Sequence, residues 1–191
     1  MAVTGRGTAA AVVALLTLAL LGPVHATQID QEASRVGFTL KTRWGKTLVG
    51  HFPRHEGVIT RMSGGMHQVR LRLSTADVEI EDSTTFTRLT RGDGFFDAAR
   101  YPWVEFVSDP YPVSLIREGG RLGGVLTIRG VERRETFVVS PPDCDDPGVG
   151  CDIVARGTVD RDDYHMGRWG FALSDEVVFS LHMRIAPDDG T

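Results

Sequence analysis

Apolar residues alternate with polar ones over many short stretches of this chain, which is the spacing of β-strands that bury one face. Between residues 36 and 41, Val36, Phe38 and Leu40 alternate with glycine, threonine and lysine. The same period of two recurs in residues 69–74, 104–106, 122–128, 137–139 and 177–185. Successive side chains of a strand point to opposite faces, so each stretch offers one apolar and one polar face. The sequence therefore predicts a mainly β domain.

Turn-forming residues separate the predicted strands. They are Ser63-Gly64-Gly65, Asp109-Pro110, Gly119-Gly120 and Pro141-Pro142. Between residues 48 and 59 the apolar phase slips near Pro53, which predicts a bulge or sharp bend within one long strand. One stretch has helical spacing: it starts near Ser83, brings Phe86 and Leu89 to one side and ends before Gly92.

About eight strands, each with one apolar face, close either as a sandwich or as an up-and-down barrel. Nearly all predicted connections are short. This favours the barrel, because a Greek-key sandwich needs longer crossovers. We therefore predict an all-β fold, an eight-stranded antiparallel, lipocalin-like barrel with one short helix. The interior of such a barrel is either filled by side chains or holds one small ligand.

The N-terminal residues have the pattern of a secretory signal peptide. Arg6 supplies positive charge, residues 9–21 are apolar and uncharged, and Val24-His25-Ala26 offers small residues for cleavage. The apolar run is shorter than the roughly 20 residues that span a bilayer, which argues against a membrane anchor. No cysteine lies near the cleavage point, which argues against a lipoprotein. We predict a signal peptide over residues 1–26 and a periplasmic or secreted domain over residues 27–191.

The charge of the predicted mature chain argues against nucleic-acid binding. The chain has 21 basic and 25 acidic residues, and cleavage removes one arginine, which leaves 20 − 25 = −5. A mildly acidic domain gains nothing from a nucleic-acid backbone or an anionic membrane surface. No nucleic-acid partner is predicted.

The two cysteines of the chain bracket a short loop. Between Cys144 and Cys151 lie Pro147, Gly148 and Gly150, so the loop turns back on itself easily. In an oxidising compartment these cysteines are expected to form a structural disulfide. A metal site would need further ligands, and only acidic residues are near, so no metal site is predicted.

The usual catalytic sequence patterns are missing, so the sequence does not predict an enzyme. No GxSxG, HExxH, P-loop or GxGxxG pattern occurs. His51 and His55 have the spacing of a helical metal pair but lie in a predicted strand, and we expect both at the surface. The charged run of residues 160–163 lacks the glycine and further oxygens of a calcium loop, and we expect a solvated turn.

Several short motifs, in order along residues 28–185, make the chain resemble the YceI family of polyisoprenoid-binding, lipocalin-like proteins. The most specific is Gly94-Phe95-Phe96-Asp97 followed by Tyr101-Pro102, Phe106 and Ser108. The others are Ile29-Asp30 with Ser34, Val36 and Phe38; Gly50-x-Phe52 and Gly57-x-Ile59; residues 124–131; Arg161 with Asp163 and Tyr164; and residues 174–177. Three positions depart from the family pattern: Ala33 and Arg88 replace histidines, and His165 replaces a glycine that a left-handed turn would favour.

The resemblance implies an elongated barrel that holds an isoprenoid tail, with no assigned reaction. The predicted wall residues are Phe38, Leu40, Phe52, Leu71, Leu73, Phe106, Leu126, Ile128, Phe137, Phe179, Leu181 and Met183. Phe95 and Phe96 are predicted near an entrance. No catalytic cofactor is predicted, while a bound isoprenoid lipid or quinone fits the resemblance. Two alternatives stay open: a lipocalin-like enzyme with an apolar substrate, and a structural or partner-binding barrel with a filled core.

The head group of the ligand is predicted to be neutral or weakly polar. Arg88, Arg91 and Arg100 flank the Phe95-Phe96 segment and would form a basic rim if that segment were the entrance. The net charge of −5 and the lack of a lysine-rich stretch favour a neutral head group such as a quinone. A homodimer and a membrane redox partner stay open.

Overall fold

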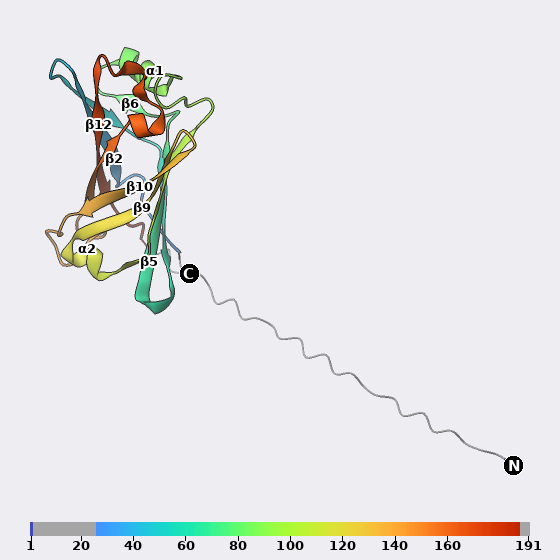
Figure 1. Cartoon of the computed structure of the whole chain (residues 1–191). Helices are drawn as coiled ribbons and strands as arrows, with labels where there is room; N and C mark the ends of the chain where they lie inside the picture. The colour runs from blue at the N-terminus through green and yellow to red at the C-terminus, as the bar shows by residue number, and fades with distance from the viewer. Residues whose placement is uncertain (2–25, 188–191) are drawn as a thin grey trace.

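The computed structural model describes Met1 and residues 26–187, which form a curled antiparallel sheet (Figure 1). The predicted signal peptide, residues 1–26, lies outside the described residues apart from Met1 and Ala26, which begins β1. The strands are β1 (Ala26–Gln28), β2 (Arg35–Thr42), β3 (Thr47–His51), β4 (His55–Arg61), β5 (Met66–Ser74), β6 (Glu79–Ile80), β7 (Trp103–Ser108), β8 (Tyr111–Pro112), β9 (Gly120–Ile128), β10 (Val131–Val139), β11 (Ile153–Asp160) and β12 (Leu173–Met183). Among the described residues, no helix combines the length and apolarity needed to cross a membrane.

Backbone contacts between the segments that follow β1 and β12 curl the sheet into an elongated barrel. The strand order is β1-β4-β5-β7-β9-β10-β11-β12-β2-β3-β6. Beyond β1 and β12, Ile29 bridges Ile185, and the Asp30 amide donates to the Arg184 carbonyl at 2.9 Å. Every pairing along this order is antiparallel, as predicted.

The sheet has twelve strands rather than the eight predicted, and the difference has two sources. The predicted long strand over residues 48–59 breaks at Phe52–Arg54 into β3 and β4. This confirms the bend near Pro53: β3 pairs with β2, whereas β4 pairs with β5. The strands that lie outside the predicted stretches are β1, β6 and β8, which have only two or three residues each, and β11, which has eight.

The predicted helix is α1 (Thr84–Arg91), and a second helix, α2 (Ser114–Glu118), was not predicted. The Ser83 hydroxyl caps α1 by accepting a hydrogen bond from the Phe86 amide at 3.2 Å, and Gly92 ends the helix. The prediction of one helix was wrong because five residues are too few to show a helical period. Three short 3-10 helices, η1 (Ser63–Gly65), η2 (Asp162–Tyr164) and η3 (Gly167–Trp169), lie in connections.

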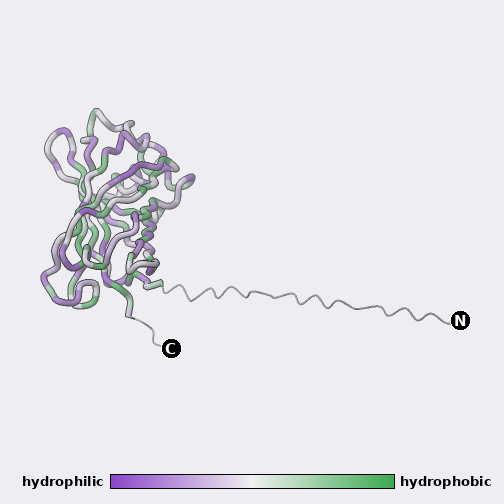
Figure 2. Tube along the Cα trace, turned by 60° about the horizontal axis from the view of Figure 1, so that its bottom comes forward, coloured by the Kyte–Doolittle hydropathy of each residue, from purple (hydrophilic) through white to green (hydrophobic). Residues whose placement is uncertain are grey.

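The apolar faces of the strands meet inside the barrel, and hydropathy alternates along them (Figure 2). Two glycines of the family motifs make room for this interior. A Cβ on Gly50 would lie 2.3 Å from Cζ of Phe38, and one on Gly57 would lie 2.3 Å from Cδ1 of Ile29. Any larger residue at these two positions would therefore displace interior side chains.

Of the two histidines predicted at the surface, one is buried. The His51 side chain is exposed and pairs with Glu81. The His55 residue is only 2% exposed, and its Nδ1 lies 2.9 Å from the Phe52 carbonyl oxygen. Its Nε2 has no hydrogen-bond partner among the described residues. The prediction failed for His55 because the bend turns this side chain toward the core.

The expectation of a wholly solvated turn over residues 160–163 was also wrong, because Arg161 is completely buried. Its guanidinium donates hydrogen bonds to the Ser174 carbonyl at 2.9 Å, to Oδ1 of Asp175 at 2.8 Å and to the Met166 carbonyl. The side chain thereby joins the loop after β11 to the start of β12. The left-handed turn survives at His165, whose φ is 57°.

Tyr164 lies beside Arg161 and is also buried. Its hydroxyl donates to Oε1 of Glu135 at 2.9 Å. Burial raises the pKa of Glu135, the hydrogen bond from Tyr164 lowers it, and Asp163 and Asp160 raise it further, with a net increase above the ordinary 4.5. Burial and the neighbouring carboxylate also raise the pKa of Tyr164, so its hydroxyl stays protonated.

The raised pKa of Glu135 predicts that the stability of the fold depends on pH. A carboxyl that binds its proton more tightly in the folded state loses stabilisation as the pH rises from its unfolded pKa through its folded pKa. Glu135→Gln keeps an acceptor for Tyr164 but does not titrate, so we expect a smaller decline in the free energy of unfolding between about pH 4 and pH 7. Urea unfolding at several pH values measures this, with the exposed Glu132→Gln as control. Equal declines in both variants would contradict the assignment.

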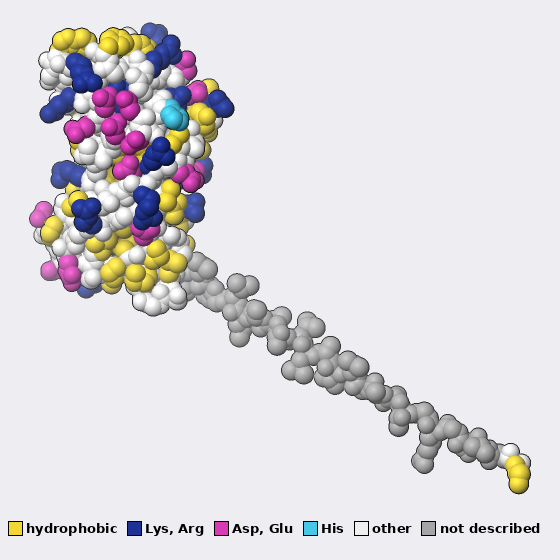
Figure 3. All heavy atoms as spheres, in the orientation of Figure 1, with side chains coloured by type: hydrophobic (Ala, Val, Ile, Leu, Met, Phe, Trp, Pro, Cys, Tyr) yellow, Lys and Arg dark blue, Asp and Glu magenta, His cyan; other side chains and the backbone are white. Residues whose placement is uncertain are grey.

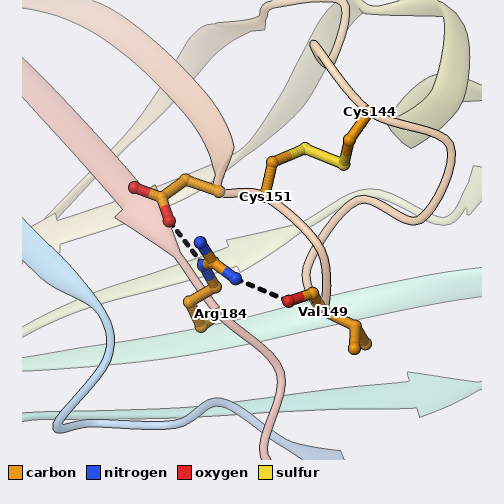
Figure 4. The surroundings of a disulfide bond; sticks show 5 residues. Cys144, Val149, Cys151 and Arg184 are labelled. Atoms are coloured by element: carbon orange, nitrogen blue, oxygen red, sulfur yellow. Dashed lines mark hydrogen bonds and ion pairs between the residues drawn. A yellow bond between two sulfur atoms is a disulfide. The ribbon is translucent and has the colours of Figure 1, made fainter.

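The predicted disulfide between Cys144 and Cys151 is present (Figure 4). The loop is held to the barrel by Arg184, whose Nη1 donates to the Val149 carbonyl at 2.5 Å and whose Nε donates to Asp152. Closing so short a loop stabilises the fold by at most about 2.5 kcal/mol.

We therefore expect the double substitution Cys144→Ser and Cys151→Ser to lower the free energy of unfolding by no more than about 2.5 kcal/mol. Urea unfolding of both proteins checks this. Thiol trapping of the denatured, unreduced native protein should find no free thiol. A loss well beyond the predicted value would mean that the disulfide holds more of the barrel than its own loop.

Candidate functional site

The barrel interior contains an apolar cavity of about 90 Å³. Twenty residues from nearly all sides of the wall line it: Ile29, Ile59, Val69, Leu71, Leu73, Val104, Phe106, Tyr111, Ile116, Leu122, Leu126, Phe137, Val139, Ile153, Ala155, Phe179, Leu181, Met183, Arg184 and Ile185. Only Tyr111 and Arg184 among them carry an ionisable side chain. The site is thus chemically suited to hydrocarbon.

All twelve predicted wall residues are buried, and eight of them line this cavity. The eight are Leu71, Leu73, Phe106, Leu126, Phe137, Phe179, Leu181 and Met183. The other four, Phe38, Leu40, Phe52 and Ile128, lie elsewhere in the core. The alternation of apolar residues along the strands thus identified the side chains that face the interior. It did not show which of them line the cavity.

Phe95 and Phe96, which were predicted near an entrance, are both buried in the core. They are 4% and 2% exposed and belong to a phenylalanine cluster of Phe38, Phe52, Phe95, Phe96 and Phe179. Neighbouring rings in the cluster have centroids 5.1–6.5 Å apart. The turn after α1 directs both side chains into the core.

The phenylalanine cluster separates the cavity from an apolar groove of about 250 Å³ beside α1. Phe38 and Phe95 face this groove, and its rim includes Trp44 and Phe171, which are 77% and 75% exposed. Phe179 lines the cavity on the other side of the cluster. The cavity and the groove share no lining residue.

The cavity instead opens toward the end of the barrel that carries α2. A groove of about 240 Å³ shares five lining residues with the cavity: Ile59, Tyr111, Ile116, Ile153 and Ile185. We call this groove the mouth. Its outer lining consists of Thr27, Arg61, His67, Val113, Arg117, Asp146 and Pro147. Hydrophobic side chains gather over the lower part of the molecule in Figure 3, the end with α2 in Figure 1.

Sequence reasoning missed twelve lining residues: Ile29, Ile59, Val69, Val104, Tyr111, Ile116, Leu122, Val139, Ile153, Ala155, Arg184 and Ile185. Val69, Val104 and Leu122 stand in phase with residues that were named, so the alternation itself could have found them. Tyr111 and Ile116 belong to β8 and α2, which were not predicted.

The ionisable groups of the cavity do not form a catalytic pair. Burial raises the pKa of Tyr111 to about 12, so its hydroxyl remains a neutral hydrogen-bond donor. Arg184 is ion-paired with Asp152 at 2.5 Å. Among the described residues, no group of three or more metal-ligating side chains is brought together.

A curled antiparallel barrel whose described residues line an apolar cavity defines the class of lipocalin-like ligand-binding barrels. The family model of YceI-like domains matches residues 28–185, and the chain belongs to this family. No curated protein matches the chain.

Solved structures share the fold at low sequence identity. BcnA of Burkholderia cenocepacia is 20% identical, with a TM-score of 0.65 over 83% of this chain and 99% of that chain. A polyisoprenoid binding domain from Saccharophagus degradans, implicated in plant cell wall breakdown, is 14% identical, with a TM-score of 0.62 over 86% and 100%. The YCEI protein of Campylobacter jejuni is 20% identical, with a TM-score of 0.55 over 73% and 85%.

Proposed function

We propose that this protein binds a polyisoprenoid or a similar apolar lipid inside its barrel and acts as a carrier rather than as an enzyme. The observation that carries the proposal is the apolar cavity that opens at one end of the barrel. The family membership and the similarity to a polyisoprenoid binding domain support it.

The energetics of burial are sufficient for such a ligand. Each five-carbon isoprene unit contributes about 4 kcal/mol of gross hydrophobic free energy. Association and ordering cost about 4–15 kcal/mol. A few buried units therefore give useful affinity.

The volume of the cavity implies that the interior adjusts to its ligand. At about 90 Å³ it is smaller than the roughly 300–1,000 Å³ of common ligand pockets. Met183 has a flexible side chain, and the rings of Phe106 and Phe137, with centroids 4.9 Å apart, also face the space. Movement of these side chains would lengthen the cavity between the barrel walls.

Native mass spectrometry combined with lipid extraction tests the proposal. Protein purified from its native host should retain a hydrophobic molecule that denaturation releases. Delipidated protein should then bind an added polyprenol. Protein that carries no lipid and binds no polyprenol would support the alternative of a structural barrel with a filled core.

We further propose that the protein is exported to the periplasm or secreted, on the basis of the predicted signal peptide and the disulfide. Fractionation of the native host and sequencing of the mature N-terminus test this. The expected first residue is Thr27. A cytoplasmic protein that retains residues 1–26 would contradict the proposal.

A further inference from the structure

The end of the barrel that carries α1 exposes large apolar side chains on three separate segments. Trp44 lies at the tip of the β2–β3 hairpin, Leu89 on α1, and Phe171 between η3 and β12. Their exposed fractions are 77%, 39% and 75%, and all three line the apolar groove beside α1. We call these three side chains the apolar rim. Large apolar residues gathered at one exposed place are typical of a surface that binds a partner or a membrane.

The three segments of the apolar rim carry basic side chains and no acidic ones. Residues 41–47, 84–91 and 167–173 contain six basic residues: Lys41, Arg43, Lys46, Arg88, Arg91 and Arg168. Arg43 pairs with Asp175, and Arg168 pairs with Asp93. The other four form no ion pair with any residue that the structure describes. Figure 3 shows hydrophobic and basic side chains together at the upper end of the molecule, the end with α1 in Figure 1.

We propose that the apolar rim docks on the surface of a membrane that contains anionic phospholipid. Trp44, Leu89 and Phe171 enter the boundary between head groups and acyl chains, and the basic side chains beside them contact the lipid phosphates. The inference goes beyond the proposed function and does not depend on it, because it concerns the outer surface of the barrel. The rim lies at the end opposite α2 (Figure 1), so the docked barrel keeps its mouth on the aqueous side.

The chemistry of the rim favours a membrane over a protein partner. Tryptophan is enriched at the boundary between membrane and water, because its ring is apolar while its N–H needs a polar contact. Lysine and arginine beside it are attracted to anionic head groups and can keep their apolar stems at the boundary. The core of a protein interface, by contrast, is depleted of lysine.

The overall charge of the domain does not prevent this docking. The net charge of −5 for the predicted mature chain opposes attraction of the whole domain to an anionic surface. Salt screens charges that lie more than about 8–10 Å from the membrane, so the residues nearest to it dominate. Those residues are the six basic side chains of the rim segments.

Vesicle sedimentation of protein purified from its native host tests the proposal. Vesicles of phosphatidylcholine alone are compared with vesicles of an equal mixture of phosphatidylcholine and phosphatidylglycerol, at low and high salt. The native protein should bind the anionic vesicles about tenfold more tightly, and high salt should reduce this preference. The double variant Trp44→Ser, Phe171→Ser should bind the anionic vesicles about tenfold more weakly or worse. The double variant Lys41→Gln, Lys46→Gln should lose most of the preference.

Two control variants remove the same kinds of side chain elsewhere. Val138→Ser with Val149→Ser replaces exposed apolar residues that do not line the groove. Arg70→Gln with Arg121→Gln removes two exposed charges on β5 and β9, strands that contribute nothing to the groove. Both controls should bind vesicles as the native protein does. Thermal unfolding of each variant verifies that it is folded.

Fluorescence reports whether Trp44 itself enters the lipid. In the variant Trp103→Phe, Trp169→Phe, it is the only one of the three tryptophans that remains. On anionic vesicles its emission should shift to shorter wavelength and be quenched by brominated phospholipid. Unshifted emission, no binding to anionic vesicles, or equal binding by the native protein and Trp44→Ser, Phe171→Ser would overturn the proposal. A native dimer that Trp44→Ser, Phe171→Ser abolishes, without vesicle binding, would identify the rim as a contact between two copies of the chain instead.

Discussion

Leu126→Asp is expected to lower the free energy of unfolding by about 4–8 kcal/mol. Leu126 is 2% exposed, belongs to β9 and lines the cavity. The substitution removes buried apolar contacts and places a carboxyl group in a cavity whose lining is almost entirely apolar. Chemical unfolding in urea measures the change.

The loss of stability in Leu126→Asp should also depend on pH. Burial raises the pKa of a carboxyl group, so the folded variant prefers the protonated form. The destabilisation should therefore be smallest at acidic pH and grow as the pH rises. A loss below about 1 kcal/mol at neutral pH would mean that water fills the cavity, and the apolar ligand site would have to be abandoned.

Leu126→Met is the matched control, because it nearly conserves volume and apolarity. It should cost less than about 1.5 kcal/mol. A side chain that faces a ligand should nevertheless change lipid binding when its shape changes. Unaltered lipid binding by the methionine variant, together with an equal loss of stability in both variants, would favour the barrel with a filled core.

The parts of the fold that the sequence predicted are those set by local rules. Side-chain alternation identifies the strands, and the phase slip near Pro53 identifies the bend between β3 and β4. The Ser83 cap and the short loop between Cys144 and Cys151 are likewise readable from neighbouring residues. Each of these features needs only a few consecutive residues and the backbone geometry that they allow.

The candidate site was harder to predict because it depends on residues distant in the chain. The mouth joins Arg61, Tyr111, Arg117 and Pro147, which come from β4, β8, α2 and the disulfide loop. No local period links them. The Phe95-Phe96 pair illustrates the opposite problem: the motif was identified, but the direction of its side chains depends on packing against Phe38 and Phe52.

The sequence did not predict the structural role of Arg161. It stands in a run of acidic residues, which is typical of a solvated turn, yet its side chain is completely buried. A buried guanidinium is stable only when its donors are satisfied, and three acceptors surround this one. Two members of the family motif, Arg161 and Tyr164, thus have a structural explanation in their buried hydrogen bonds.

Arg161→Met is expected to lower the free energy of unfolding by about 3–5 kcal/mol. Methionine fills much of the same space, so the loss reports mainly on the hydrogen bonds to Ser174, Met166 and Asp175. Two carbonyl oxygens lose the guanidinium as a donor, and Asp175 keeps its pair with Arg43 at 3.1 Å. Arg161→Lys should recover part of the loss, since one ammonium cannot reproduce the three directions of the guanidinium. The control is Arg168→Met, which removes a solvent-exposed pair with Asp93 and should cost less than about 1 kcal/mol. Similar small losses for Arg161→Met and Arg168→Met would show that the buried guanidinium does not hold the loop to β12.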